Sequence, residues 1–139
     1  MTTQLNPFGG TSLRGVQGYT LDQAGRPVLT VTGYMPQIVV GSPAAAVTTT
    51  RAAVDGAAHR LQLVTVAFSG AGSGPVVLTV TDGATPVLVL DLNVAVGSPY
   101  ILALENGGLT GTVGNALTVS VSAGAASSVC TLSTGVTTS

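Results

Sequence analysis

The sequence contains no lysine, and 6% of its 139 residues are charged, against roughly 25% in an ordinary soluble domain. The positive and negative charges nearly cancel; they are Arg14, Arg26, Arg51, Arg60, Asp22, Asp55, Asp82, Asp91 and Glu105. No stretch gathers the basic side chains that would neutralise phosphates. We therefore expect no nucleic-acid partner.

A long apolar run is also missing, although 45% of the residues are hydrophobic. No window reaches the roughly 18 apolar residues that a membrane-spanning helix needs. The N-terminus, MTTQLNPFGG, has neither the cationic region nor the apolar region of a secretory signal. We therefore expect no membrane partner and no export through the secretory pathway.

Cysteine and histidine occur once each. A single cysteine, Cys130, excludes an internal disulfide framework, and we expect it to be a small buried hydrophobe. His59 lies beside Arg60 and near Asp55, but no nucleophile is placed beside it, so a structural role is expected. A metal site needs three or four suitably spaced ligands. The sequence thus predicts no catalytic residue, no metal site and no cofactor, and we expect a protein that is not an enzyme.

The strongest pattern runs from Pro75 to Asn93. Apolar and polar residues alternate up to Asp82-Gly83, which is a hairpin-turn signal. After the turn, Val87 and Val89 point to one face, while Leu88, Leu90 and Leu92 point to the other. We expect this second strand to be buried on both faces, either in the middle of a sandwich or under another subunit.

Asp91 interrupts the apolar face that carries Val87 and Val89. A buried carboxylate needs a partner. We expect a salt bridge to Arg51 or Arg60, or a hydrogen bond at the end of the strand.

Further short strands are expected on both sides of this hairpin, separated by turn signals and with no helical periodicity. They span Ala46–Val54, Leu61–Ser69, Pro99–Leu104, Leu109–Val113, Asn115–Ala123 and Ser127–Ser133. The pattern predicts an all-β fold, a two-sheet antiparallel β-sandwich over residues 44–139. A jelly roll is the first topology and an immunoglobulin-like order the alternative. The Thr48-Thr49-Thr50 run could form a hydroxyl ladder, but without a regular T-x-T repeat we expect an ordinary solvated strand face.

Residues 1–43 are rich in proline, glycine and aromatic residues, and only Val28–Thr32 has a strand pattern. We expect an extended N-terminal arm, which either packs on its own domain or lies on neighbouring subunits. The weak surface charge favours a homo-oligomer, because little charge keeps copies apart. The expected interface residues are Leu5, Phe8, Tyr19 and Tyr34 in the arm, and Val87, Val89 and Leu90 in the sandwich.

The run from Pro43 to Gly70, PAAAVTTTRAAVDGAAHRLQLVTVAFSG, resembles the opening of a family of small β-sandwich domains found among phage virion proteins. The likeness continues at the Asp82-Gly83 turn. It closes with GGLTGTVGNALTVSVSAG, from Gly107 to Gly124, which is similar to the family's "GL-x-GT-x-G-x-ALTV" segment. It covers roughly residues 43 to 134 and leaves out the N-terminal arm.

The resemblance implies a jelly-roll-like sandwich that forms a homo-oligomer, a trimer, on a virion. It would be a capsid decoration (cement) protein that contacts the major capsid protein on the capsid surface and is assembled in the host cytoplasm. The alternative is a head- or tail-fibre module that binds a receptor. Sugar recognition is less expected, because tryptophan is absent and only Phe68 and Tyr100 are aromatic beyond the arm.

Overall fold

The structure is a computed structural model that describes residues 19–21, 27–29 and 35–139. The chain divides into two units, Met1–Gly33 and Tyr34–Ser139. In the first unit, β1 (Tyr19–Leu21) pairs antiparallel with β2 (Pro27–Leu29). The expected strand Val28–Thr32 overlaps β2, and its last three residues lie outside the described part.

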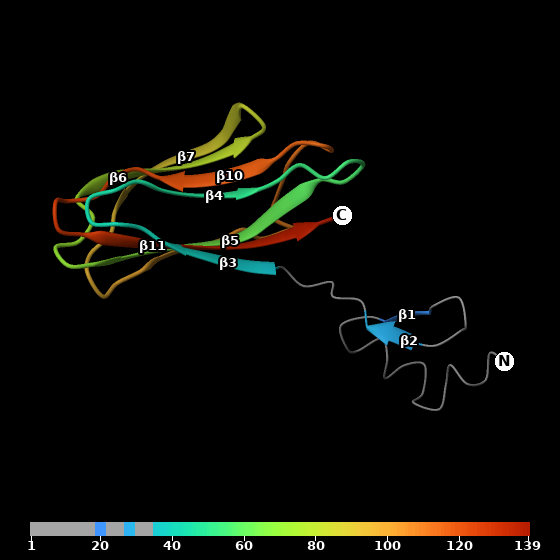
Figure 1. Ribbon diagram of the computed structural model, residues 1–139, viewed down its shortest axis with the longest axis horizontal. Helices are drawn as coiled ribbons and strands as arrows, with labels where there is room; N and C mark the ends of the chain where they lie inside the picture. Colours follow the sequence, from blue (N-terminus) through green and yellow to red (C-terminus); the bar gives the residue numbers. More distant parts are fainter. Residues whose placement is uncertain (1–18, 22–26, 30–34) are drawn as a thin grey trace. The chain divides into compact units, whose positions relative to one another are not determined.

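The second unit is a sandwich of two antiparallel sheets (Figure 1). The four-stranded sheet has the order β4-β10-β6-β7, and its strands are Val47–Arg51 (β4), Leu117–Val121 (β10), Pro75–Asp82 (β6) and Thr85–Asn93 (β7). The five-stranded sheet has the order β3-β11-β5-β8, and its strands are Met35–Val40 (β3), Val129–Thr138 (β11), His59–Ser69 (β5) and Tyr100–Ala103 (β8), with the short β9 (Leu109–Thr110) also paired to β5.

The strand order is that of a jelly roll. When β9 is set aside and the sandwich strands are counted from β3, one sheet reads 2-7-4-5 and the other 1-8-3-6. Apart from the β6–β7 hairpin, the neighbours in each sheet are not consecutive strands, because the chain repeatedly crosses between sheets. The predicted all-β sandwich and its first topology are confirmed, and the immunoglobulin-like order is not adopted.

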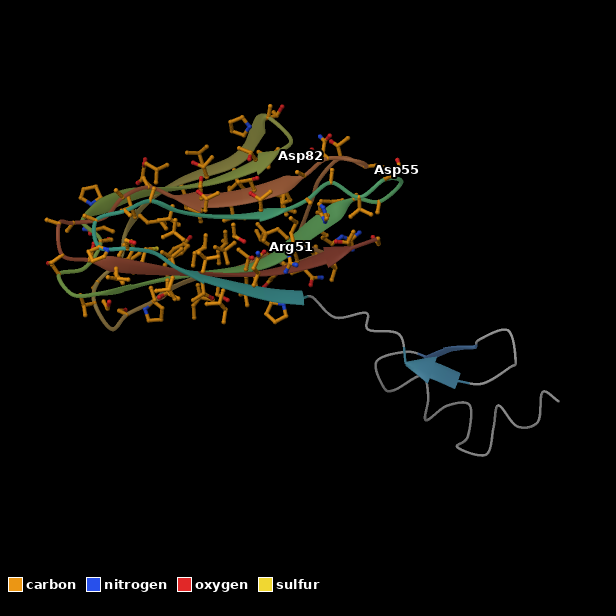
Figure 2. All side chains as sticks on the ribbon, in the orientation of Figure 1. Arg51, Asp55 and Asp82 are labelled. Carbon is orange, nitrogen blue, oxygen red and sulfur yellow. The ribbon has the colours of Figure 1, made fainter. Side chains whose placement is uncertain are left out.

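The core lies between the two sheets, where most inward positions of both are apolar (Figure 2). Strand β5 alternates buried and half-buried residues along most of its length, as expected for a strand with one face on the core. The buried apolar side chains are Val47, Leu61, Val64, Val66, Phe68, Val76, Leu78, Val80, Leu92, Val94, Leu117, Val119, Val121, Cys130, Leu132 and Val136.

The sandwich begins earlier than the expected boundary at residue 43. Strand β3, which the sequence analysis assigned to the arm, pairs with β11 from Met35↔Val136 to Val40↔Thr131. It is the first strand of the jelly roll and an edge of the five-stranded sheet. Its pairing partner lies about a hundred residues away in the sequence, so local periodicity carries no sign of it.

The C-terminal strand is longer than expected. Residues 134–138, which lie beyond the expected strand Ser127–Ser133, continue β11 and pair with β5 as far as Thr138↔His59. The register shifts between Gly135 and Val136, where β5 carries one extra residue, Gln62. Such a bulge realigns the pairing without ending it.

The strand after Asp82-Gly83 does not lie in the middle of the sandwich, and its burial under another subunit stays a prediction. Strand β7 is an edge of its sheet, with β6 on one side and no partner on the other in the described part of the chain. Val87 and Val89 are 42% and 56% exposed. Leu88 and Leu90, on the opposite face, pack against the core. The strand is therefore buried on its inner face alone.

Candidate assembly interface

The outer face of the five-stranded sheet carries three of the exposed large aliphatic side chains of the described residues. Strand alternation places Pro36, Ile38 and Val40 of β3 on this side, together with Thr131, Ser133 and Gly135 of β11, Leu63, Thr65 and Ala67 of β5, and Ile101 and Ala103 of β8. We call these eleven residues the outer face. Ile38, Val40 and Ile101 are 66%, 64% and 62% exposed.

The strand register brings these side chains into rows. Ile38 pairs with Ser133, Ser133 with Thr65, and Thr65 with Ile101, so one row crosses all four strands. Isoleucine side chains stand at its two ends and small hydroxyl side chains fill its middle. A second row runs from Val40 through Thr131 to Ala67.

No residue of the outer face is charged. Along β5 the next outward residue past the bulge is Arg60, whose Nε donates to Thr110 Oγ1 at 3.2 Å. Its guanidinium lies beside Gly107, in the turn that Glu105 begins. Charge therefore lies at one end of the sheet, beyond the outer face.

The outer side of the four-stranded sheet is different, because it is lined by hydroxyls. Thr118 pairs with both Thr50 and Thr81, and Ser120 pairs with both Thr48 and Thr79. The hydroxyls of Thr50 and Thr118 lie 3.0 Å apart in a hydrogen bond. The pairs Thr48/Thr50, Thr79/Thr81 and Thr118/Ser120 are distant in the sequence. Across β4, β10 and β6 they form two rows of hydroxyl side chains, which we call the hydroxyl ranks. The expected solvated strand face is present, and the sheet assembles a regular ladder that the sequence does not show as a repeat.

The expected interface residues of the sandwich separate into two groups. Val87 and Val89 stand on the outer side of β7, next to the hydroxyl ranks, where Val89 pairs with Thr79. Leu90 points the other way and packs against the core. Val87 and Val89 stay predictions as contact residues, whereas Leu90 is a core residue of the isolated domain.

The expected interface residues of the arm are mostly beyond the described residues. Leu5, Phe8 and Tyr34 lie outside them. Tyr19 belongs to β1, where its backbone pairs with Leu29. Their role as anchors stays a prediction.

Asp91 is not the buried carboxylate that we expected. It is exposed on the outer side of β7, across from Val77 of β6. Arg51, one of its expected partners, occupies an inward position at the end of β4 and lies between the two sheets in Figure 2. The carboxylate keeps its hydration because β7 is an edge strand, so it needs no buried partner.

Asp82, which is labelled in Figure 2, lies at the end of β6 and has a structural role. Its Oδ2 accepts hydrogen bonds from Thr112 Oγ1 at 2.6 Å and from the Thr112 amide at 2.9 Å. The Thr112 hydroxyl, above all, lowers the pKa of Asp82 below its ordinary value. The carboxylate ties the 111–115 turn to the hairpin.

His59 is buried at the start of β5, with 3% of its surface exposed. Nε2 donates to the carbonyl oxygen of Ala52 at 2.7 Å, and Nδ1 lies 2.8 Å from the hydroxyl of Thr138. Both ring nitrogens are therefore engaged by structural partners, as expected for a structural histidine.

Cys130 is a buried thiol on the inner side of β11. Burial raises its pKa to about 11, so the reactive thiolate is scarce at neutral pH. The prediction of a small buried hydrophobe is confirmed. In the described residues, no group of three histidine, cysteine, aspartate or glutamate side chains is arranged to hold a metal ion.

The sequence reasoning missed Ile38, Val40 and Ile101. In β3 the alternation Pro36, Ile38, Val40 against Gln37 and Val39 is a weak strand signal, and the prolines nearby obscure it. In β8 the signal was present, because Ile101 and Ala103 alternate with Tyr100 and Leu102, which pack against the core. What the sequence could not supply was the register that places Ile38 and Ile101 in one row.

No family model matches the chain, and no curated protein matches it. Similar solved structures include a carbohydrate-binding module, CBM36, in complex with calcium and xylotriose, with a TM-score of 0.36 and 13% identity over 77% of this chain and 90% of that one. A second carbohydrate-binding module, CBM4, gives a TM-score of 0.36 and 20% identity over 87% of this chain and 92% of that one. A structure of the infectious bursal disease virus Gx strain gives a TM-score of 0.24 and 11% identity over 86% of this chain and 43% of that one. These scores are too low to support a statement about function.

Among the described residues, no helix has the length and hydropathy that crossing a membrane requires.

Proposed function

We propose that this chain is a virion structural protein without catalytic activity, a decoration protein that binds the major capsid protein and stabilises a phage head as a homo-oligomer. The observation that carries the proposal is the exposure of large aliphatic side chains on the outer sides of both sheets. They are Ile38, Val40 and Ile101 on one sheet, and Val87 and Val89 on the other.

Such a domain is suited to binding through extended contact. Monomeric proteins rarely expose contiguous apolar patches of more than a few hundred Å², and larger patches usually mark interaction sites. A decoration protein stabilises a shell because it binds the assembled form and not the dissociated one, so many weak contacts add up. A domain with adhesive surfaces on opposite sides can contact its own copies with one and the shell with the other.

The resemblance of Pro43–Gly70 and Gly107–Gly124 to phage virion domains supports the same proposal. The first stretch contributes β4, the whole of β5 and the turn that His59 holds. The second contributes β9, β10 and the turn that binds Asp82. The motifs of the resemblance are therefore the turns and strands that build the sandwich, and the proposed attachment to a capsid depends on the surfaces described above.

The test is co-sedimentation with empty heads purified from the phage that encodes the chain and stripped of accessory proteins. The proposal predicts that the protein pellets with the heads at a saturable ratio, and that decorated heads withstand a higher temperature than stripped heads. Protein that stays in the supernatant at every ratio would contradict attachment to the head. Binding to host cells instead of heads would favour the alternative, a fibre or receptor-binding module.

A further inference from the structure

We propose that the outer face of the five-stranded sheet is the surface through which copies of this chain associate. The inference rests on the proposed function, since it names the partner of one of the two adhesive surfaces. It differs from the expectation that association runs through β7, and the difference can be measured.

The charge distribution favours a second copy as the occupant. The outer face carries no charged side chain, and the whole chain has a formal net charge of −1. Two copies can therefore bring this surface together without burying an unpaired charge or opposing like charges, both of which oppose association. A partner with an ordinary charged surface would lose the hydration of its charges and find no countercharge here.

The outer side of β7 is less suited to the same contact. Asp91 stands on that side two residues beyond Val89, and the neighbouring strand β6 presents the hydroxyls of Thr79 and Thr81. Burying this surface against a copy would bring two Asp91 carboxylates into a dehydrated contact or require them to be paired. Its mixture of hydroxyls, two valines and a carboxylate is better suited to a hydrated contact with a different protein.

The size of the outer face is that of an interface centre. Four strands about 4.8 Å apart and five residues at about 3.3 Å each give a surface of roughly 19 by 17 Å, or about 300 Å². The largest apolar patch of an ordinary monomer is about 300–600 Å² and is often functional, and a stable pair buries about 800 Å² per partner. The contact therefore extends past the uncharged outer face to a rim, which the exposed edge of β3 and the polar end near Arg60 can supply. A centre depleted of charged residues inside a polar rim is the usual anatomy of such contacts.

The experiment compares the masses of four proteins by size-exclusion chromatography with multi-angle light scattering. The unmodified chain should have a mass at least twice its 13.6 kDa. Ile38→Lys and Ile101→Lys each place a charge in the row that crosses the outer face, and each should yield a monomer or raise the dissociation constant at least 100-fold. Val89→Lys, a matched change at a 56% exposed position of the other sheet, should leave the mass unchanged.

A second measurement does not depend on the lysine variants folding. Ile101→Cys introduces an exposed thiol, while Cys130 is buried, so a short bis-maleimide should join two copies in the variant and not in the unmodified chain. Oligomers that persist in both lysine variants, or an Ile101→Cys protein that is not cross-linked, would overturn the proposal. Dissociation by Val89→Lys alone would transfer the contact to β7.

The outcomes also separate this inference from the proposed function. If oligomers persist in the lysine variants and the protein still pellets with heads, the association surface is wrong and the decoration role stands. If the lysine variants are monomers but the unmodified oligomer does not pellet with heads, the surface is right and the decoration role is wrong. A monomeric unmodified chain at high concentration would overturn the association surface and the homo-oligomer of the proposed function together.

Discussion

The imidazole of His59 links the two sheets: its Nε2 lies 2.7 Å from the carbonyl oxygen of Ala52, just past the end of β4, while His59 itself opens β5. A carbonyl oxygen can only accept, so Nε2 carries the proton of this hydrogen bond. Nδ1 forms the second hydrogen bond of the ring, with the hydroxyl of Thr138 at the end of β11. One side chain thus holds the ends of three strands together.

Replacing this side chain should weaken the fold. His59→Ala removes a buried ring and leaves the Ala52 carbonyl without its donor, which should lower the free energy of unfolding by about 3 kcal/mol. Urea denaturation followed by circular dichroism measures this. Arg60→Ala changes the next residue, whose hydrogen bond is exposed, and should cost less than about 1 kcal/mol. Equal losses in the two variants would show that the His59 contacts contribute nothing specific.

Asp82 should make the fold sensitive to acid. Its pKa is lowered in the folded protein, chiefly by the Thr112 hydroxyl, so its contribution to stability is fully present above the unfolded value. The contribution is lost as the pH falls below about 3.8 and through the folded pKa. Thermal melts between pH 6 and pH 2 should therefore show a smaller acid-induced decrease in Asp82→Asn than in the unmodified chain.

The control for that series is Asp91→Asn, which removes an exposed carboxylate from β7 and leaves Asp82 and Thr112 in place. Its melting temperature should follow the pH curve of the unmodified chain. If Asp82→Asn follows that curve as well, the Thr112 hydrogen bonds do not favour the charged carboxylate.

Gly70 should tolerate no side chain. Its φ is +88°, and a Cβ there would collide with the carbonyl oxygen of Ser127 in the backbone. Gly70→Ala should lower stability by about 3 kcal/mol or more, from the clash together with the left-handed conformation. Gly56 has a φ of +72° but no atom within 4 Å of the added Cβ. Gly56→Ala should therefore cost only about 1 kcal/mol, and equal melting temperatures for the two variants would contradict the collision.

Thr134 offers a stabilising change. Its side chain is 2% exposed on the inner side of β11, and among the described residues its Oγ1 has no hydrogen-bond partner. Thr134→Val replaces the hydroxyl by a methyl group of similar shape, and should raise the free energy of unfolding by about 1 kcal/mol. Thr50→Val, which removes an exposed hydrogen bond to Thr118, should change it by less than about 0.5 kcal/mol. A loss of stability in Thr134→Val would mean that the hydroxyl has a partner.

The fold class could be predicted from the sequence because local signals dominate most of the sandwich. The β6–β7 hairpin follows from the Asp82-Gly83 turn, and β5 and β10 follow from alternation. The position of a strand within its sheet has no local signal. Strand β7 is apolar on both faces and yet lies at an edge, and β3 pairs with a segment about a hundred residues away, so the sequence assigned it to the arm.

The same limit applies to the surface. Ile38 and Ile101 are unremarkable as single residues, and each becomes part of an apolar surface only through the pairing of β3, β11, β5 and β8. The hydroxyl ranks of Thr48, Thr50, Thr79, Thr81, Thr118 and Ser120 depend on register in the same way. Periodicity reports which side of a strand faces the core, whereas the composition of an outer surface is set by which strands become neighbours.

Sedimentation equilibrium of the unmodified chain is the most direct test of the homo-oligomer that the proposed function requires. Over a range of concentrations, we expect a single species with a mass of at least two copies of 13.6 kDa, and of three copies if the resemblance to trimeric virion domains holds. A mass that stays at one copy up to the highest concentration would contradict it.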